Sequence, residues 1–336
     1  MVIKINIVFA VILSYIFYFV IEGNSPYDFT HWIFYIFFPL VIIIIPLLIS
    51  FIIKVRHFEY IDHYKILKFL GEGGMGRVYK AKDFKVNKIV AIKLLHSAVT
   101  VDEEGKKRFR LIEKLSKELK HQNIIRIIST GIWKNQSYFV MEYLKGKTLN
   151  QIISKKNQFS LKEIINISLQ VAYALKEVHN KNIVHRDVKS DNIFLTDHHI
   201  VKLMDFDLAR LEKASSDDQG KAFLGTLSYM SPQQAVGESI DHRSDIYSLG
   251  VIMYELATGR LPFLANRDMT LIYEIFKNKP ISIQKLRKNF PIALEKCILK
   301  AMAKEVKHRF DNVNELIMEL ERINNLLKKR KYYRIK

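Results

Sequence analysis

Carboxylate and amide side chains gather in one short stretch of the chain. Residues 185–192 read HRDVKSDN, and Asp205-Phe206-Asp207 follows after a short gap. A carboxylate can accept the proton of a hydroxyl group, and carboxylate and amide oxygens together can hold magnesium on phosphate groups. Asp187, Asn192 and Asp205 are therefore the side chains whose types and spacing could do chemistry.

Two further motifs lie upstream of this stretch. Residues 70–78 read LGEGGMGRV, and glycines at such a turn let the backbone approach a phosphate without a Cβ in the way. Alone, this motif could equally be a dinucleotide-binding turn or an ordinary hairpin, but apolar-rich segments at 64–70 and 77–82 favour strand–turn–strand. Residues 90–93 then read VAIK. Any single lysine is usually a surface residue, but in this context Lys93 is a candidate phosphate ligand.

In this order the motifs resemble those of protein kinases. The resemblance continues through GTLSYMSPQQA at 225–235, DIYSLG at 245–250 and KHRF at 307–310, so it covers roughly residues 60–326. The chain looks most like the bacterial serine/threonine kinases of eukaryotic (Hanks) type. In that family a lysine two residues after the catalytic aspartate, here Lys189 after Asp187, marks specificity for Ser/Thr rather than Tyr.

The resemblance implies a role for each residue of the catalytic loop. Asp187 would accept the proton of a substrate Ser or Thr hydroxyl, and Lys189 would stabilise the charge on the transferred γ-phosphoryl group. Lys93 would orient the phosphates and would itself pair with Glu113, in a charged helix expected at about 103–120. Asp245 would brace the catalytic loop.

The implied cofactors are ATP and Mg²⁺ or Mn²⁺, with Asn192 and Asp205 as metal ligands. A hinge between the two lobes would offer backbone groups of Glu142 and Leu144 to the adenine, with Met141 at the back of the pocket. The expected ATP-binding residues are Leu70, Gly71, Gly73, Gly76, Val78, Ala91, Lys93, Met141, Glu142 and Leu144.

Activation-loop phosphorylation is a further expectation. Arg186 is the kind of arginine that pairs with a phosphate on this loop. Between residues 208 and 224 the only hydroxyl side chains are Ser215 and Ser216, so autophosphorylation is expected at one of them. A homodimer would allow the reaction to occur in trans.

Two positions depart from the family pattern. Asp207 stands where the family has glycine, which adds a carboxylate near the phosphates, and Gln233 stands where the family has glutamate. We expect a neutral-to-charged hydrogen bond between Gln233 and Arg309 in place of a buried ion pair. Two alternatives to an active protein kinase remain: a pseudokinase that scaffolds partners at the membrane, and a small-molecule phosphotransferase, which would lack the 225–235 segment.

Two long apolar runs precede the kinase-like region. Residues 5–21 and 33–53 carry no charged side chain, and 21 residues suffice to span a bilayer. Lys4, Lys54 and Arg56 lie on the outer flanks, whereas the connecting segment has no Lys or Arg, which predicts a hairpin with both ends in the cytoplasm. The alternative is a signal peptide cleaved near Ser25, although no A-x-A-like site is present. Either arrangement leaves the kinase-like region in the cytoplasm.

The composition fits this picture. The formal net charge of +19 suggests an anionic neighbour, and because no nucleic-acid motif accompanies it, membrane lipids rank first and no nucleic acid is expected. The only cysteine, Cys297, excludes an intrachain disulfide and is expected to be a buried small hydrophobe. Protein substrates bearing Ser or Thr are the other expected partners.

The predicted fold is therefore an α+β, two-lobed protein-kinase fold preceded by a two-helix transmembrane hairpin. We expect the hairpin at 1–56 (a multi-pass anchor in the cytoplasmic membrane), a linker at 57–63, the kinase domain at 64–326 and a basic tail at 327–336. The small lobe would occupy about 64–141 and the large lobe about 145–326. Expected elements include strands at 123–128 and 137–141 and helices at 161–179 and 244–258.

Overall fold

A computed structural model describes residues 60–74, 76–96, 109–110, 113–114, 118–156, 158–205, 227–265 and 267–329. The chain divides into a unit of Met1–Ile61 and a unit of Asp62–Lys336. The predicted membrane hairpin, most of the helix expected at 103–120, both predicted phosphosites and residues 330–336 lie outside the described residues, and so does Asp207. Within the described part, no helix has both the length and the apolar character needed to cross a membrane. The hairpin and the domain boundaries therefore stay predictions.

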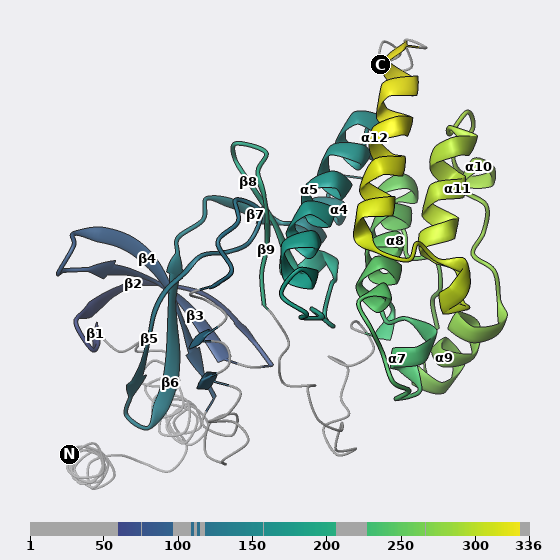
Figure 1. The fold of residues 1–336 in the computed structure, drawn as a ribbon. Helices are drawn as coiled ribbons and strands as arrows, with labels where there is room; N and C mark the ends of the chain where they lie inside the picture. The colour runs from purple at the N-terminus through teal and green to yellow at the C-terminus, as the bar shows by residue number, and fades with distance from the viewer. Residues whose placement is uncertain are drawn as a thin grey trace, which may run out of the picture. The chain divides into compact units, whose positions relative to one another are not determined.

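The small lobe is an antiparallel sheet in the order β2-β3-β4-β6-β5 (Figure 1). A two-residue strand, β1 (Tyr60–Ile61), precedes it. Successive side chains of a strand point to opposite faces, so Ile92 lies on one face of β4 while Ala91 and Lys93 share the other. The strands are β2 (Tyr64–Gly73), β3 (Gly76–Asp83), β4 (Lys88–Leu95), β5 (Ile127–Trp133) and β6 (Gln136–Glu142).

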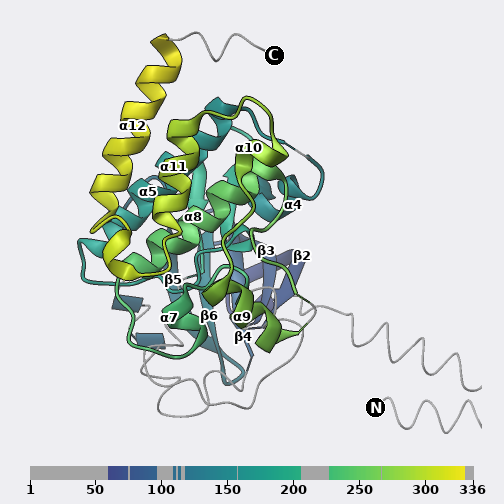
Figure 2. The ribbon, with the colours of Figure 1, turned by 90° about the vertical axis from the view of Figure 1, so that its right-hand side faces the viewer.

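The large lobe is mainly helical and carries a small sheet of order β7-β8-β9 on the side of the small lobe (Figure 1). Helix α8 is buried along nearly its whole length, as expected for a helix that is apolar on every side, and it packs against α5 and α11 (Figure 2). The elements are β7 (Gly146–Thr148), β8 (Ile193–Thr196), β9 (Val201–Leu203), α4 (Leu149–Ile153), α5 (Leu161–His179), α7 (Pro232–Ala235), α8 (Arg243–Thr258), α9 (Asp268–Lys277), α10 (Ile283–Leu286), α11 (Ile292–Ala301) and α12 (Val313–Lys329), with 3₁₀ turns η2 (Ser190–Asn192) and η4 (Val306–His308).

Several expected elements are confirmed. Helix α5 has the predicted bounds, and a capping box fixes its start because Ser160 and Glu163 each bond the other's backbone amide. Helix α8 begins one residue earlier than predicted, and β6 contains the strand expected at 137–141. Cys297 is buried in α11, as its apolar surroundings indicated.

The strand predicted at 123–128 is wrong in its first half. Strand β5 begins only at Ile127. The preceding residues bond to the large lobe instead: Ile125 N–H donates to Leu203 O at 2.9 Å, and Leu203 N–H donates to Asn123 O at 2.8 Å. The Asn123 amide fixes this arrangement because it is buried and donates to Val201 O at 2.9 Å. This extended segment therefore joins the small lobe to β9, the strand that leads to Asp205.

Candidate active site

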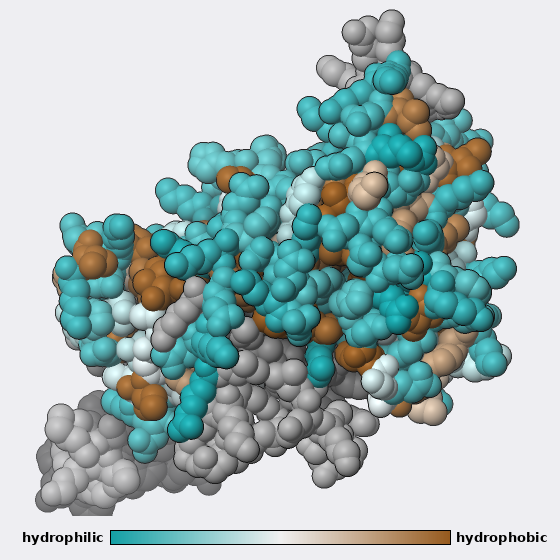
Figure 3. Space-filling view, viewed as in Figure 1, coloured by the Kyte–Doolittle hydropathy of each residue, from teal (hydrophilic) through white to brown (hydrophobic). Residues whose placement is uncertain are grey.

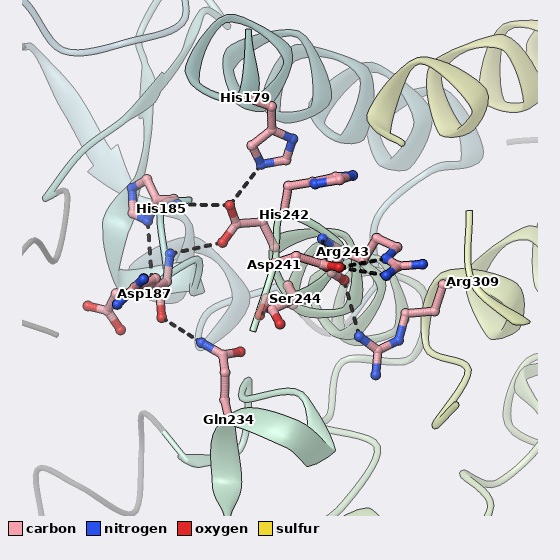
Figure 4. Close-up of polar contacts among 12 residues, drawn as sticks. His179, His185, Asp187, Gln234, Asp241, His242, Arg243, Ser244 and Arg309 are labelled. Carbon is pink, nitrogen blue, oxygen red and sulfur yellow. Dashed lines mark hydrogen bonds and ion pairs between the residues drawn. The ribbon is translucent and has the colours of Figure 1, made fainter. Parts of the chain in front are cut away.

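The catalytic-loop segment 185–192 is held from behind by one carboxylate on α8. Asp245 Oδ2 accepts the His185 amide at 2.8 Å, and its Oδ1 accepts the Arg186 amide at 2.9 Å (Figure 4). His179 Nε2 lies 2.8 Å from the same Oδ2 and ties the end of α5 to the loop. Asp245 is almost fully buried, so these bonds are not exchanged with water. The predicted bracing role is the one the geometry supports.

The two carboxylate oxygens of Asp187 differ in their hydrogen bonds. The Asn192 amide donates to Asp187 Oδ2 at 2.7 Å and to its backbone oxygen at 2.8 Å, and Lys189 Nζ lies 2.9 Å from Oδ2. Oδ1, in contrast, is buried and finds no hydrogen-bond partner among the described residues. A buried acceptor without a partner is costly unless something else satisfies it. Asp187 therefore keeps one carboxylate oxygen that no described group engages, and a carboxylate oxygen of this kind could accept the proton of a hydroxyl group.

Asp205 lies across from this loop and pairs with Lys93. Its backbone has φ of 50°, a left-handed conformation that a non-glycine residue adopts only when its surroundings enforce it. Lys93 Nζ donates to Oδ1 at 2.6 Å. Burial alone would raise the pKa of the Asp205 carboxyl, but the Lys93 ammonium holds it below its ordinary value, with smaller contributions from His185 and Lys189. Asp205 is therefore ionised at neutral pH and able to ligate a cation.

Lys93 was expected to pair with Glu113, and in the structure its ammonium contacts Asp205. Glu113 lies in a short helical segment, half-buried, and the pairing with Lys93 stays a prediction.

A cavity of about 670 Å³ opens between the two lobes beside this pair. A volume of this size suits a nucleotide-sized ligand. Nine of the ten residues expected at the ATP site line it, namely Leu70, Gly71, Gly73, Val78, Ala91, Lys93, Met141, Glu142 and Leu144. Gly76 does not line the cavity. It lies in β3 opposite Leu95 of β4, and an added Cβ would lie 2.2 Å from the Leu94 backbone oxygen.

Sequence reasoning missed part of the cavity wall. Phe194 on β8 and Met204, which precedes Asp205, both line the cavity. Ile125, in the segment that bonds to β9, lines it as well. The apolar runs around Phe194 and Met204 are visible in the sequence, but nothing there shows that they face the nucleotide cavity rather than the core. Tyr143, Thr148 and Gln151 complete the rim near the hinge.

The hinge is fixed by the side chain of Glu142. Its Oε1 accepts the Arg126 amide at 2.9 Å and the Lys202 ammonium at 2.7 Å, and its own amide donates to Arg126 O at 3.0 Å. The Glu142 amide is thus already used, which leaves the carbonyl oxygen of Glu142 for an adenine. Leu144 lines the cavity next to it.

The other side of the loop is held by a buried chain of hydroxyls. Ser190 Oγ lies 2.7 Å from the Tyr229 hydroxyl, which donates to Glu255 Oε2 at 2.7 Å. Burial, with a smaller contribution from the neighbouring Asp191, raises the pKa of the Glu255 carboxyl to about 7, although the hydrogen bond from Tyr229 acts in the opposite direction. Gln234 also holds the loop by donating to Arg186 O at 3.1 Å (Figure 4).

The predicted bond at the departure from the family pattern is confirmed. Arg309 Nη2 donates to Gln233 Oε1 at 2.5 Å, and the guanidinium is almost fully buried. Its other donors reach only backbone oxygens, those of Ala303, Lys304 and Arg243.

The arrangement fits the divalent metal expected from the sequence. Within the described ranges no three or more His, Cys, Asp or Glu side chains form a cluster that could hold a metal ion. Magnesium commonly takes only one or two protein ligands and completes its shell with water and substrate phosphates. Asp205 is ionised by its surroundings, and the Asn192 amide nitrogen faces Asp187, which leaves its oxygen as an acceptor. These two residues are suited to such a site.

Known proteins are similar to this chain in sequence and in fold. A probable serine/threonine-protein kinase of Clostridium acetobutylicum is 37% identical over 264 residues, which cover 79% of this chain and 40% of that protein. The serine/threonine-protein kinase PknB of Mycobacterium tuberculosis is 34% identical over 270 residues, with 79% and 43% covered. The chain thus spans less than half the length of these curated relatives.

A solved structure and a family model agree with these relatives. The crystal structure of the Mycobacterium tuberculosis PknI kinase domain matches with a TM-score of 0.62 at 24% identity, over 78% of this chain and 97% of that one, and so shows the fold. The model of the protein kinase domain matches residues 64–334. The chain belongs to the protein kinase domain family.

Proposed function

We propose that the chain is a serine/threonine protein kinase that transfers the γ-phosphoryl group of ATP to Ser or Thr hydroxyls of protein substrates. The observation that carries this proposal is the free oxygen of Asp187, which is buried beside Lys189 and without a partner among the described residues. A base with one satisfied and one available oxygen is suited to accept a proton from a positioned hydroxyl.

Each residue then has a defined task. Asp187 Oδ1 would accept the proton of the substrate hydroxyl as the hydroxyl oxygen attacks the γ-phosphorus and the bond from that phosphorus to the departing ADP breaks. Lys189, whose ammonium lies 2.9 Å from Asp187 Oδ2, would neutralise charge on the transferred group. The Lys93 ammonium, which contacts Asp205 in the structure, would contact the nucleotide phosphates instead. Asn192 and Asp205 would hold Mg²⁺ or Mn²⁺, which supplies positive charge on the phosphate oxygens when bound. The Glu142 carbonyl orients the adenine from the hinge.

Phosphate transfer from labelled ATP to a generic basic protein tests the proposal. Asp187→Asn should lower kcat about 100-fold or more while ATP affinity stays nearly unchanged, because shape is kept and the base is lost. Lys93→Met should lower turnover by removing phosphate positioning. The matched controls Asp311→Asn and Lys288→Met make the same charge changes at exposed positions and should behave as wild type.

The outcome also separates the kinase from a scaffold. A protein that binds ATP, transfers no phosphate and is indifferent to Asp187→Asn would be a pseudokinase. The described residues favour transfer, since Lys93, Asp187, Asn192 and Asp205 are all present and lie at one cavity or its adjoining loop.

We further propose that the kinase is tethered to the cytoplasmic membrane by the two apolar runs at 5–21 and 33–53, with the catalytic region in the cytoplasm. The charge asymmetry of the flanking residues supports this topology. Cysteines introduced at Ser25 and, separately, at Ser215 test it on intact cells with an impermeant thiol reagent. Labelling at Ser25 alone is expected, and labelling at Ser215 alone would reverse the arrangement.

A further inference from the structure

Lysines face one another across strands β2 and β3. The antiparallel register pairs Lys65 with Lys82 and Lys68 with Lys80, and a bulge at Leu67 keeps all four on one face of the sheet. Like charges directly opposite in a sheet are destabilising. Such a repeated pairing is therefore a cost to the fold, unless an anion on this face offsets it.

The protein does not neutralise these lysines itself. None of the four makes an ion pair in the part of the chain that the structure describes. Two of them instead lie over aromatic rings: Lys80 Nζ is 4.6 Å from the centre of the Tyr143 ring, and Lys82 Nζ is 5.5 Å from that of Phe84. These contacts hold the ammonium groups at the sheet surface without removing their charge.

The adjoining β3–β4 turn adds exposed apolar side chains to the same end of the sheet. Phe84 is 52% exposed and Val86 is 58% exposed, with Lys85 between them. The turn is rigid, because Asp83 Oδ1 accepts the amides of Lys85 at 2.8 Å and Val86 at 3.3 Å. In Figure 3 hydrophobic patches interrupt the hydrophilic surface over this lobe.

We propose that this lysine face, defined as Lys65, Lys68, Lys80, Lys82 and Lys85 with the apolar tip Phe84 and Val86, binds the anionic headgroups of the cytoplasmic leaflet. Lysines that surround exposed aromatic and aliphatic side chains are the composition of a membrane-surface contact, in which the apolar groups enter the headgroup layer. An acidic protein segment would pair with the lysines but would leave Phe84 and Val86 exposed to water.

The length of chain before the sheet supports a lipid partner, and this step rests on the proposed membrane hairpin. Residues 54–59 separate the second apolar run from Tyr60. Six extended residues reach about 20 Å at most, so a small lobe tethered in this way stays near the bilayer. At physiological salt the attraction acts over about 8 Å, which makes a nearby lysine face effective.

Amine-reactive labelling read by mass spectrometry tests the proposal without altering the protein. The full chain is placed in nanodiscs of phosphatidylcholine alone or of phosphatidylcholine mixed with phosphatidylglycerol. The lysine-face residues should label about fivefold more slowly in the anionic discs, the protection that about 1 kcal/mol per lysine contact gives. High salt should abolish the difference. Lys285 and Lys288, which are exposed on the large lobe, should label equally in both discs.

A triple variant provides the second arm. Lys65→Gln/Lys68→Gln/Lys82→Gln should remove the protection of Lys85, whereas Lys285→Gln/Lys288→Gln/Lys296→Gln, with the same loss of charge, should not. Labelling that is equal in both discs, or protection that extends to the control lysines, overturns the proposal. A chain that fails to enter the nanodiscs at all refutes the hairpin instead, and phosphate transfer in detergent remains a separate measurement of the kinase activity.

Discussion

Replacing Gln233 by glutamate should stabilise the protein, because Arg309 is a buried cation with no carboxylate among its described hydrogen-bond partners. Its guanidinium is 3% exposed, donates to Gln233 Oε1 at 2.5 Å and to the Ala303 oxygen at 2.6 Å, and lies 5.0 Å from the centre of the Tyr247 ring. All of its described hydrogen-bond acceptors are neutral oxygens.

The cost of this burial can be estimated from the arginine itself. Desolvation lowers the pKa of Arg309 to about 10, well below the ordinary value of an arginine. The charged form is therefore less stable in the fold than in the unfolded chain by about 3 kcal/mol, and this cost would be relieved only as the pH rises above about 10. At neutral pH the protein carries all of this cost.

A carboxylate at position 233 would recover part of it. The new charge must itself be desolvated, and the bond from Gln233 Nε2 to the Lys304 oxygen at 3.1 Å is lost. A net gain of about 1 to 2 kcal/mol remains, since a charge-assisted bond is about twice as strong as a neutral one. For a domain of this size the melting temperature should rise by about 4 °C.

Thermal unfolding of the full chain in detergent measures the effect. Gln284→Glu adds the same charge at an exposed position and should leave the melting temperature within about 1 °C of wild type. In an Arg309→Met background, Gln233→Glu should become destabilising, because its carboxylate is then buried without a cation. A gain that persists in the Arg309→Met background, or no gain in the wild-type background, would refute the reasoning.

Three further predictions concern pH, the hinge and the activation loop. Because burial raises the pKa of Glu255 to about 7, the folded state keeps a proton that the unfolded chain has already lost. The free energy of unfolding should therefore fall by up to about 3 kcal/mol between about pH 5 and pH 8. Denaturant unfolding across this range measures the slope, which Glu255→Gln should flatten. Lys202→Met removes the hinge partner of Glu142 and should raise KM for ATP about fivefold with kcat nearly unchanged, whereas Lys202→Arg should restore KM; a fall in kcat alone would contradict a hinge role. The double variant Ser215→Ala/Ser216→Ala should lose the activation produced by preincubation with ATP. If mass spectrometry finds both serines unmodified in a wild-type protein that is fully active, activation by phosphorylation at these serines is refuted.

The sequence predicts most of the nucleotide cavity because the Gly-rich turn and the VAIK segment lie on neighbouring antiparallel strands, whose pairing brings them together. The register pairs Val78 with Lys93, so the lysine shares a face of the sheet with the strand that follows the Gly-rich turn. The hinge follows from the same pattern, since β6 pairs with β4 and ends at Glu142. Helix α5 is equally readable, with a capping box at its start and an apolar stripe along its length.

Contacts between distant segments are where the sequence fails. A run of apolar residues after Asn123 is indistinguishable from a sheet strand, and only the buried amide of Asn123 commits this segment to Val201 and Leu203 in the large lobe. The Lys202–Glu142 pair likewise joins residues 60 positions apart, and neither residue type nor local spacing indicates it. In each case a single polar side chain decides between packings that apolar periodicity leaves equivalent.

The catalytic loop shows the same division at the level of function. Its motif identifies Asp187, but the backbone that aims Asp187 is strained, since Arg186 has φ of 68°. That conformation persists because Asp245 binds two successive amides of the loop and is itself held by His179. The backbone that carries the base is therefore held by α8 and α5, while Asn192 and Lys189 of the loop itself fix the carboxylate. A helix buried on every side is the element least able to shift, which makes α8 a suitable support for a base that must keep one oxygen free.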